Sequence, residues 1–173
     1  MVLRSHRLPV LLALLSLLLA GCSLDRYNFI FNDNVVYSPN TALQDAVLRD
    51  AALQACLNQS LTKAGSEDLN GITLLACPSA GVETLVGIDA LENLQQLELS
   101  DNAVSNLSPL GNLRNLRVLS LRNNRIGNVG VLESLPLLRF LALDGNNGIP
   151  CRQLDSLERK LGNTLSRPTG CAQ

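Results

Sequence analysis

Few side chains in this 173-residue chain could carry out chemistry. The one histidine, His6, lies near the start, and if the first residues are removed no imidazole remains for a catalytic triad or a metal site. A serine–lysine pair would need Lys63 or Lys160, both expected at exposed helix positions. HExxH, GxSxG, P-loop and GxGxxG motifs are absent from the sequence. We therefore expect no enzymatic activity.

The five cysteines are the remaining reactive groups: Cys22, Cys56, Cys77, Cys151 and Cys171. In a chain of this length they can form disulfides, bind a metal or carry a lipid. Metal binding is not favoured because there is no CxxC spacing and no histidine outside the first residues. We expect no metal and no cofactor. The role of Cys56, Cys77, Cys151 and Cys171 then depends on the helices and strands that position them.

The start of the chain predicts a signal segment over residues 1–21. A basic start precedes an apolar run from Leu8 to Leu19, which is shorter than the about 20 residues of a membrane-spanning helix. The run ends in Leu19-Ala20-Gly21-Cys22, which resembles the lipobox of bacterial lipoproteins. The resemblance implies cleavage before Cys22, a thioether-linked diacylglycerol on its sulfur and a membrane anchor. Ser23 suggests the outer membrane; the alternative is a plain signal peptide with Cys22 as an ordinary thiol.

Residues 22–39 form a tether or lead-in that is rich in aromatic residues. Alternation at Tyr27, Phe29 and Phe31, followed by the turn-prone Asn32-Asp33-Asn34, predicts two short strands. The alternative is an extended segment that lies on the following cap.

A 22-residue repeat dominates the rest of the chain. The segment from Leu94 to Asn102 recurs from Leu116 to Asn124 and from Leu138 to Asn146. These segments resemble the leucine-rich repeat, and their length looks most like the bacterial internalin-type class. The resemblance covers about residues 69–149 and implies an α/β solenoid. We expect a short horseshoe of about four coils, with parallel strands on the concave face and helical caps at both ends.

The repeat pattern has a physical explanation. Alternate leucines of a strand, such as Leu97 and Leu99, point to one side and pack inside the solenoid. Asn102, Asn124 and Asn146 turn the chain out of the strand, and their amides are expected to form a structural ladder. Each coil alone has an open apolar face, so its stability comes from its neighbours.

Two caps are expected to cover the ends of the array. Residues 40–68 predict an N-terminal helix with Asp50 as its N-cap, and residues 150–173 predict a C-terminal helix carrying Leu154, Leu157 and Leu161. This geometry favours disulfides Cys56–Cys77 and Cys151–Cys171, one in each cap, among three possible pairings. A buried free thiol at Cys77 is the alternative for the first pair.

Residues between the inward leucines should face the concave side and form its candidate protein-binding surface. The 22-residue step gives three columns, and the candidates within them are Leu74, Gln96, Glu98, Val118, Ser120, Arg122, Phe140 and Asp144. Aromatic lead-in residues such as Phe29 or Tyr37 are the alternative occupants of the apolar column. Replacement of Phe140 by alanine is expected to cost more than an ordinary surface change.

Charge narrows the choice of partners. The net charge of −1 argues against a general nucleic-acid binder. Residues 23–101 hold eleven acidic and three basic residues (net −8), whereas residues 102–173 hold four and nine (net +5). We expect a lipid-anchored, monomeric envelope protein whose concave face binds another protein. The alternative is a structural envelope element that contacts peptidoglycan or lipopolysaccharide.

Overall fold

The computed structural model describes residues 29–31, 34–37, 48–65 and 68–172, which fall into two compact units, 1–41 and 42–173. In the first unit β1 (Phe29–Phe31) pairs antiparallel with β2 (Asn34–Tyr37), as the alternation of the lead-in predicts. Cys22 and the expected signal segment lie outside the described residues. The alternative that Phe29 or Tyr37 covers the apolar column stays a prediction.

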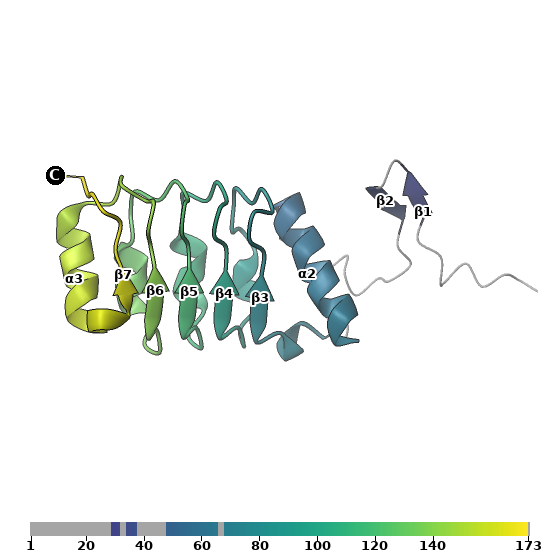
Figure 1. Ribbon diagram of the computed structural model, residues 1–173. Helices are drawn as coiled ribbons and strands as arrows, with labels where there is room; N and C mark the ends of the chain where they lie inside the picture. Colours follow the sequence, from purple (N-terminus) through teal and green to yellow (C-terminus); the bar gives the residue numbers. More distant parts are fainter. Residues whose placement is uncertain (1–28, 32–33, 38–47, 66–67, 173) are drawn as a thin grey trace, which may run out of the picture. The chain divides into compact units, whose positions relative to one another are not determined.

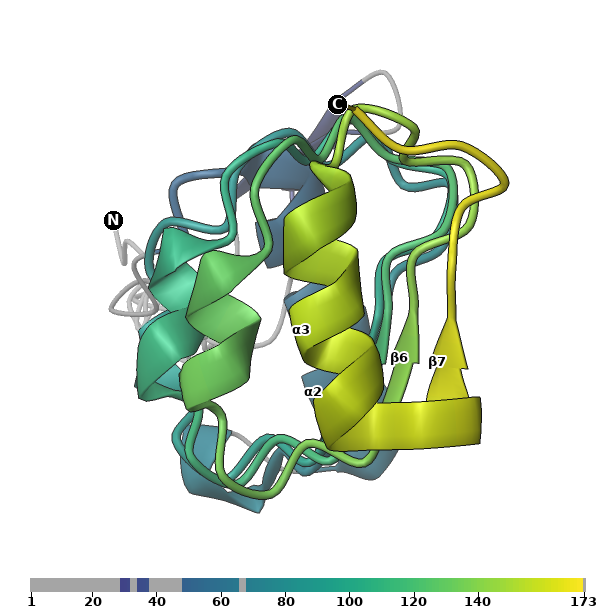
Figure 2. The ribbon, with the colours of Figure 1, turned by 90° about the vertical axis from the view of Figure 1, so that its left-hand side faces the viewer.

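The second unit is a stack of coils that share one parallel sheet. Its strands run in the order β3-β4-β5-β6-β7, and Figure 1 shows them side by side between the helices α2 and α3. Short 3-10 helices lie on the return side of the coils, opposite the sheet, as the view along the stack shows (Figure 2). The bounds of the main elements are α2 Ala51–Ala64, β3 Leu74–Ala76, β4 Gln96–Glu98, β5 Val118–Ser120, β6 Phe140–Ala142, α3 Cys151–Leu161 and β7 Leu165–Ser166; the return-side 3-10 helices are Ile88–Ala90, Ser108–Asn112 and Gly130–Ser134.

The leucines of successive strands align as the 22-residue step predicts. Leu97 pairs in register with Leu119, and Leu119 with Leu141. All three side chains are buried, and the leucines of the return side join them in one aliphatic core. Because strand side chains alternate, this register also fixes which residues point outward from the sheet.

A buried asparagine links each coil to the one before it. The Nδ2 of Asn124 donates to the carbonyls of Leu99 (2.8 Å) and Leu121 (3.1 Å), while its Oδ1 accepts from the amide of Val104 (2.9 Å). Asn146 repeats the pattern one coil later and is only 2% exposed. Asn102 bridges its own coil to the first one, where Ala80 stands in the asparagine position. Each amide therefore bonds to backbone groups of two coils. These groups lie beside the leucine core, where water does not reach them as a partner.

The helices at the two ends of the array pack on the aliphatic core. Leu53, Leu57 and Leu61 of α2 and Leu154, Leu157 and Leu161 of α3 are buried in the core. The structure joins Cys56 to Cys77, with Cα atoms 5.9 Å apart, and Cys151 to Cys171, with Cα atoms 5.1 Å apart. These are the two pairs that the sequence favours. The first joins α2 to the residue after β3, and the second joins the start of α3 to the C-terminal segment. In the described part of the chain, no helix has the length and apolar character needed to span a membrane.

Asp50 holds α2 and the first coil together through both of its carboxylate oxygens. Its Oδ1 accepts from the amides of Ala52 and Leu53 (both 3.0 Å), which confirms the predicted N-cap. Its Oδ2 accepts from the amides of Glu83 (2.8 Å) and Thr84 (3.0 Å) of the first coil. Burial by itself raises the pKa of Asp50, but the four N–H donors outweigh it and lower the pKa below its ordinary value.

The C-terminal part contains a strand that the sequence analysis does not predict. After α3 the chain returns to the sheet as β7, where Leu165 pairs with Leu141 and Ser166 with Ala142. Lys160 also ties α3 to the last return segment, because its Nζ donates to the carbonyls of Glu133 (2.9 Å) and Leu135 (2.7 Å). The C-terminal segment therefore extends the sheet as well as packing a helix on the core.

Replacement of Asn124 by alanine tests the role of the buried amide. The change leaves the buried amide of Val104 without its partner and removes one of the two amide bonds to each of the Leu99 and Leu121 carbonyls, which Asn102 and Asn146 still bind. We therefore expect a loss of about 1–3 kcal/mol in the free energy of unfolding. Urea unfolding followed by circular dichroism measures it. Asn115→Ala, at an exposed asparagine, is the matched control; equal losses in the two variants would contradict a special role for the ladder.

Asp50 gives the stability of the fold a pH dependence. Because its pKa is lowered in the folded state, its contribution is complete above the ordinary Asp value of about 4 and is lost as the pH falls through the folded-state value. Asp50→Asn retains one acceptor oxygen but turns an NH2 group toward an amide donor, so we expect a loss of about 1–3 kcal/mol at pH 7. The difference between wild type and variant should shrink on acidification. Unfolding titrations at several pH values measure it, with exposed Asp89→Asn as control.

Candidate binding face

The outward side chains of β3 to β6 form the surface that the sequence analysis places on the concave side. We call it the outer sheet face. The strand register brings its first column together, since Leu74 pairs with Gln96, Gln96 with Val118 and Val118 with Phe140. The second column contains Ala76, Glu98, Ser120 and Ala142, and the third contains Pro78, Ser100, Arg122 and Asp144.

The first column is apolar and open to solvent. Leu74 is 52% exposed and Phe140 is 38% exposed, while Val118 between them is half-buried and Gln96 is exposed. Of the three large apolar side chains that are exposed in the described part of the chain, Leu74 and Phe140 belong to this column. An exposed aromatic ring beside aliphatic side chains is typical of the centre of a protein interface.

Two members of the second column, Ser120 and Ala142, are buried, whereas Ala76 is exposed and Glu98 is half-buried. Ser120 is 6% exposed, and its Oγ lies 2.8 Å from the Oγ of Ser100 in a hydrogen bond. Ala142 is fully buried. The sequence predicts Ser120 at the binding surface. Its hydroxyl is instead buried and bonded to Ser100, so Ser120 is not available to contact a partner.

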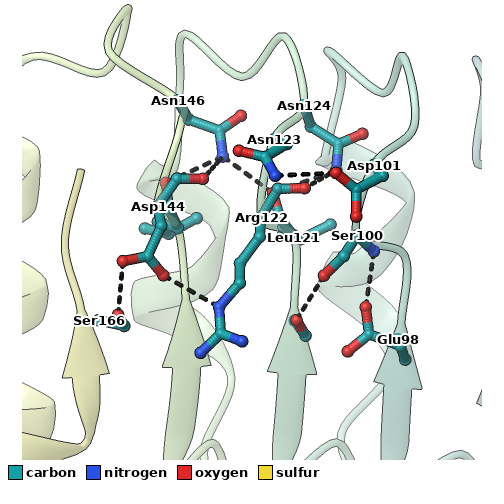
Figure 3. A network of polar contacts seen from close by, with 12 residues as sticks. Glu98, Ser100, Asp101, Leu121, Arg122, Asn123, Asn124, Asp144, Asn146 and Ser166 are labelled. Atoms are coloured by element: carbon teal, nitrogen blue, oxygen red, sulfur yellow. Dashed lines mark hydrogen bonds and ion pairs between the residues drawn. The ribbon is translucent and has the colours of Figure 1, made fainter. Parts of the chain in front are cut away.

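A polar network fills the third column, as Figure 3 shows. The Nε of Arg122 donates to Oδ2 of Asp144 at 3.1 Å, and the hydroxyl of Ser166 donates to Oδ1 of Asp144 at 2.8 Å. Burial raises the pKa of Asp144, but the bonds from Ser166 and Arg122 outweigh it, so the pKa lies below its ordinary value. Oε1 of Glu98 accepts from the amide of Ser100 at 2.7 Å. Arg122 and Asp144 thus neutralise each other in place.

The hydroxyl groups of this network are engaged with one another and with a carboxylate. Ser100 and Ser120 bond to each other, and Ser166 donates to Asp144. Within the described ranges, no group of three or more His, Cys, Asp or Glu residues is placed to hold a metal ion. The face therefore offers apolar contact, hydrogen bonding and charge, which are the means of recognition.

A further column at the strand exits was not anticipated from the sequence. Ser79, Asp101 and Asn123 adopt positive φ values of 52°, 59° and 52°, and Gly145 follows at 79°. Nδ2 of Asn123 donates to Oδ1 of Asp101 at 2.8 Å. A Cβ on Gly145 would come within 3.0 Å of the Cα of Asn123. The signal was available, since Asp, Asn and Gly tolerate this conformation best and recur at the 22-residue step.

Comparison with known proteins agrees with this geometry. Residues 92–128 and 114–159 match the family described as leucine-rich repeats in two copies. These coils resemble leucine-rich repeats. Internalin H of Listeria monocytogenes is 39% identical over 72 residues, which are 42% of this chain and 12% of that protein.

Solved structures give the same result. The crystal structure of an internalin, inlF, from L. monocytogenes has a TM-score of 0.62 at 30% identity and covers 74% of this chain and 38% of its own. That of internalin C2 from the same organism has a TM-score of 0.57 at 31% identity and covers 70% of this chain and 57% of its own. The array is therefore similar in fold to these two internalin structures. The chain spans only part of the length of each of these relatives.

Proposed function

We propose that this chain is a protein-binding module of the bacterial envelope and that its outer sheet face makes the contact. The observation that carries the proposal is the first column, in which Phe140 is exposed beside its register partner Val118 and Leu74 is exposed at the other end of the column. Large apolar side chains gathered on one face are unusual in a protein that binds nothing. Leucine-rich-repeat solenoids, moreover, typically use the extended surface of their sheet for binding.

The proposed contact set combines the apolar column with the polar residues beside it. It comprises Leu74, Gln96, Glu98, Val118, Arg122, Phe140 and Asp144. Four strands at about 4.8 Å spacing give a narrow face, whereas a stable interface buries about 1,200–2,000 Å² in total. We therefore expect a small partner or a transient complex, with α2 and α3 closing the two ends of the array outside the contact.

The envelope location rests on Cys22 and the Leu19-Ala20-Gly21 sequence before it. In the proposed mature protein, acyl chains on Cys22 anchor the leucine-rich repeats to a membrane, with the outer membrane as the proposed site. Burial of a CH2 group of an acyl chain contributes about 0.8 kcal/mol, so several chains give stable anchoring. The two disulfides support a compartment outside the cytoplasm, because cytoplasmic thiols are kept reduced.

Site-specific photo-crosslinking in the native bacterium tests the protein-binding proposal. A photoreactive phenylalanine at Phe140 should give discrete protein adducts, because this position faces the partner. The same group at Asn112, exposed at the end of a return-side helix, is the matched control and should give none. Adducts to glycan alone at position 140 would instead favour a structural envelope element that contacts peptidoglycan or lipopolysaccharide.

The lipid anchor is tested separately. Wild-type cells fed with an alkyne-labelled fatty acid should incorporate the label into this chain, whereas Cys22→Ser should abolish incorporation and release the protein from the membrane fraction. Cys56→Ser with Cys77→Ser removes two other cysteines and serves as control. Equal labelling of wild type and Cys22→Ser would contradict lipidation at this residue.

A further inference from the structure

Two arginines at the start of neighbouring strands carry charge that the described part of the chain does not neutralise. Arg117 directly precedes β5 and Arg139 directly precedes β6. Their backbones are adjacent, since the amides of Arg139 (2.9 Å) and Phe140 (3.0 Å) both donate to the carbonyl of Arg117. Both side chains are exposed, and neither makes an ion pair or a hydrogen bond with another described residue.

Two other arginines of the same unit are paired, whereas Arg49, Arg114, Arg125, Arg152 and Arg159 likewise form no ion pair with a described residue. Arg122 is bound to Asp144 one column away, and Arg167 is bound to Asp155 and Glu158. The corresponding positions in the two preceding coils hold Thr73 and Gln95, which supply no negative charge. Two like charges one strand spacing apart repel each other, so their juxtaposition is unfavourable until an anionic group lies between or above them.

The arginines border the exposed apolar column. Val118 follows Arg117, Phe140 follows Arg139, and Val118 and Phe140 are a register pair. Arg117, Val118, Arg139 and Phe140, which we call the strip, therefore place two exposed arginines next to an apolar register pair. Arginine and aromatic residues are the types that contribute most to protein interfaces, and a partner that matched the strip would place carboxylates beside an apolar side chain.

The backbone of the strip offers no free N–H group to an anion. The amides of Arg117 and Val118 donate to the carbonyl of Gln95, and those of Arg139 and Phe140 donate to that of Arg117. Phosphate sites in proteins commonly use free backbone N–H groups, and these four are all occupied. What remains is guanidinium chemistry, whose planar donors bind carboxylate and phosphate alike; carboxylates are the anions that the side chains of a partner protein supply.

We propose that the outer sheet face recognises an acidic segment of a partner protein, in which carboxylates bind Arg117 and Arg139 and an adjacent apolar side chain contacts Phe140 and Val118. The proposal rests on the protein-binding function proposed above and names the class of partner. The net charge of +5 over residues 102–173 attracts such a segment at long range and speeds the encounter.

The test uses the full chain and an array of peptides in which every sequence exists in a Glu, a Gln and a Lys version. Wild type should bind Glu versions at least about tenfold more tightly than Gln versions, with the preference falling as salt rises. Arg117→Glu with Arg139→Glu should lose the preference and gain affinity for Lys versions. Arg117→Gln with Arg139→Gln removes the charge without adding repulsion and should lose the preference alone.

The matched control changes the same total charge elsewhere. Arg125→Glu with Arg152→Glu alters two exposed arginines outside the strip and should keep the Glu preference. A wild type without preference for Glu versions, or equal losses in strip and control variants, overturns the proposal. So does binding to phosphatidylglycerol vesicles or inorganic phosphate, or self-association in sedimentation equilibrium, that depends on the strip while Glu-peptide binding does not.

The crosslinking experiment separates this proposal from the broader one. If the protein adduct at position 140 forms in wild type and survives Arg117→Glu with Arg139→Glu, the acidic-segment proposal fails and protein binding stands. If the adduct is lost in that variant and kept in the Arg125→Glu, Arg152→Glu control, both are supported. If no protein adduct forms in wild type, the proposed function itself fails.

Discussion

The fold depends on satisfying the backbone at the place where each coil leaves the sheet. There the chain turns inside an aliphatic core that offers no polar partner, and an unpaired buried carbonyl or amide is costly. The amides of Asn124 and Asn146 resolve this by bonding to two coils at once. Because the same atoms determine the turn and the spacing between coils, the strands are held in register and the outward columns follow from it.

The two ends of the stack need a different solution, because the first and last coils have a neighbour on one side only. At the first end, Asp50 replaces the missing neighbour with a carboxylate that bonds both to α2 and to the Glu83 and Thr84 amides. At the last end, β7 continues the hydrogen bonding of β6, and Lys160 reaches carbonyls of the last return segment. Polar contacts thus fix where the terminal leucines sit, and a disulfide lies beside each.

Periodicity explains what the sequence can and cannot predict. Leu97, Leu119 and Leu141 repeat at equal steps, so their alignment follows from the 22-residue period alone. The period does not predict β7, because Leu165 lies 24 residues after its register partner Leu141 and not 22 (165 − 141 = 24). The second role of Asp50 depends on contacts 33 and 34 residues away, which no local pattern reports. Arg122 and Asp144 lie one 22-residue step apart, so the period predicts that they are neighbours but not that they form an ion pair. The burial of Ser120 likewise depends on its three-dimensional surroundings, whereas its place in the column does not.

The register between β4, β5 and β6 has an evolutionary consequence. Each coil meets the next through the same pairing and the same asparagine bridge, so the surface that one coil presents to its successor is interchangeable with that of any other. Duplication or deletion of one 22-residue unit in the gene would therefore lengthen or shorten the array without disturbing either terminus. The number of coils is therefore the property of this fold that changes most easily in evolution. A change in that number widens or narrows the outer sheet face by whole strands, whereas its chemistry changes one residue at a time.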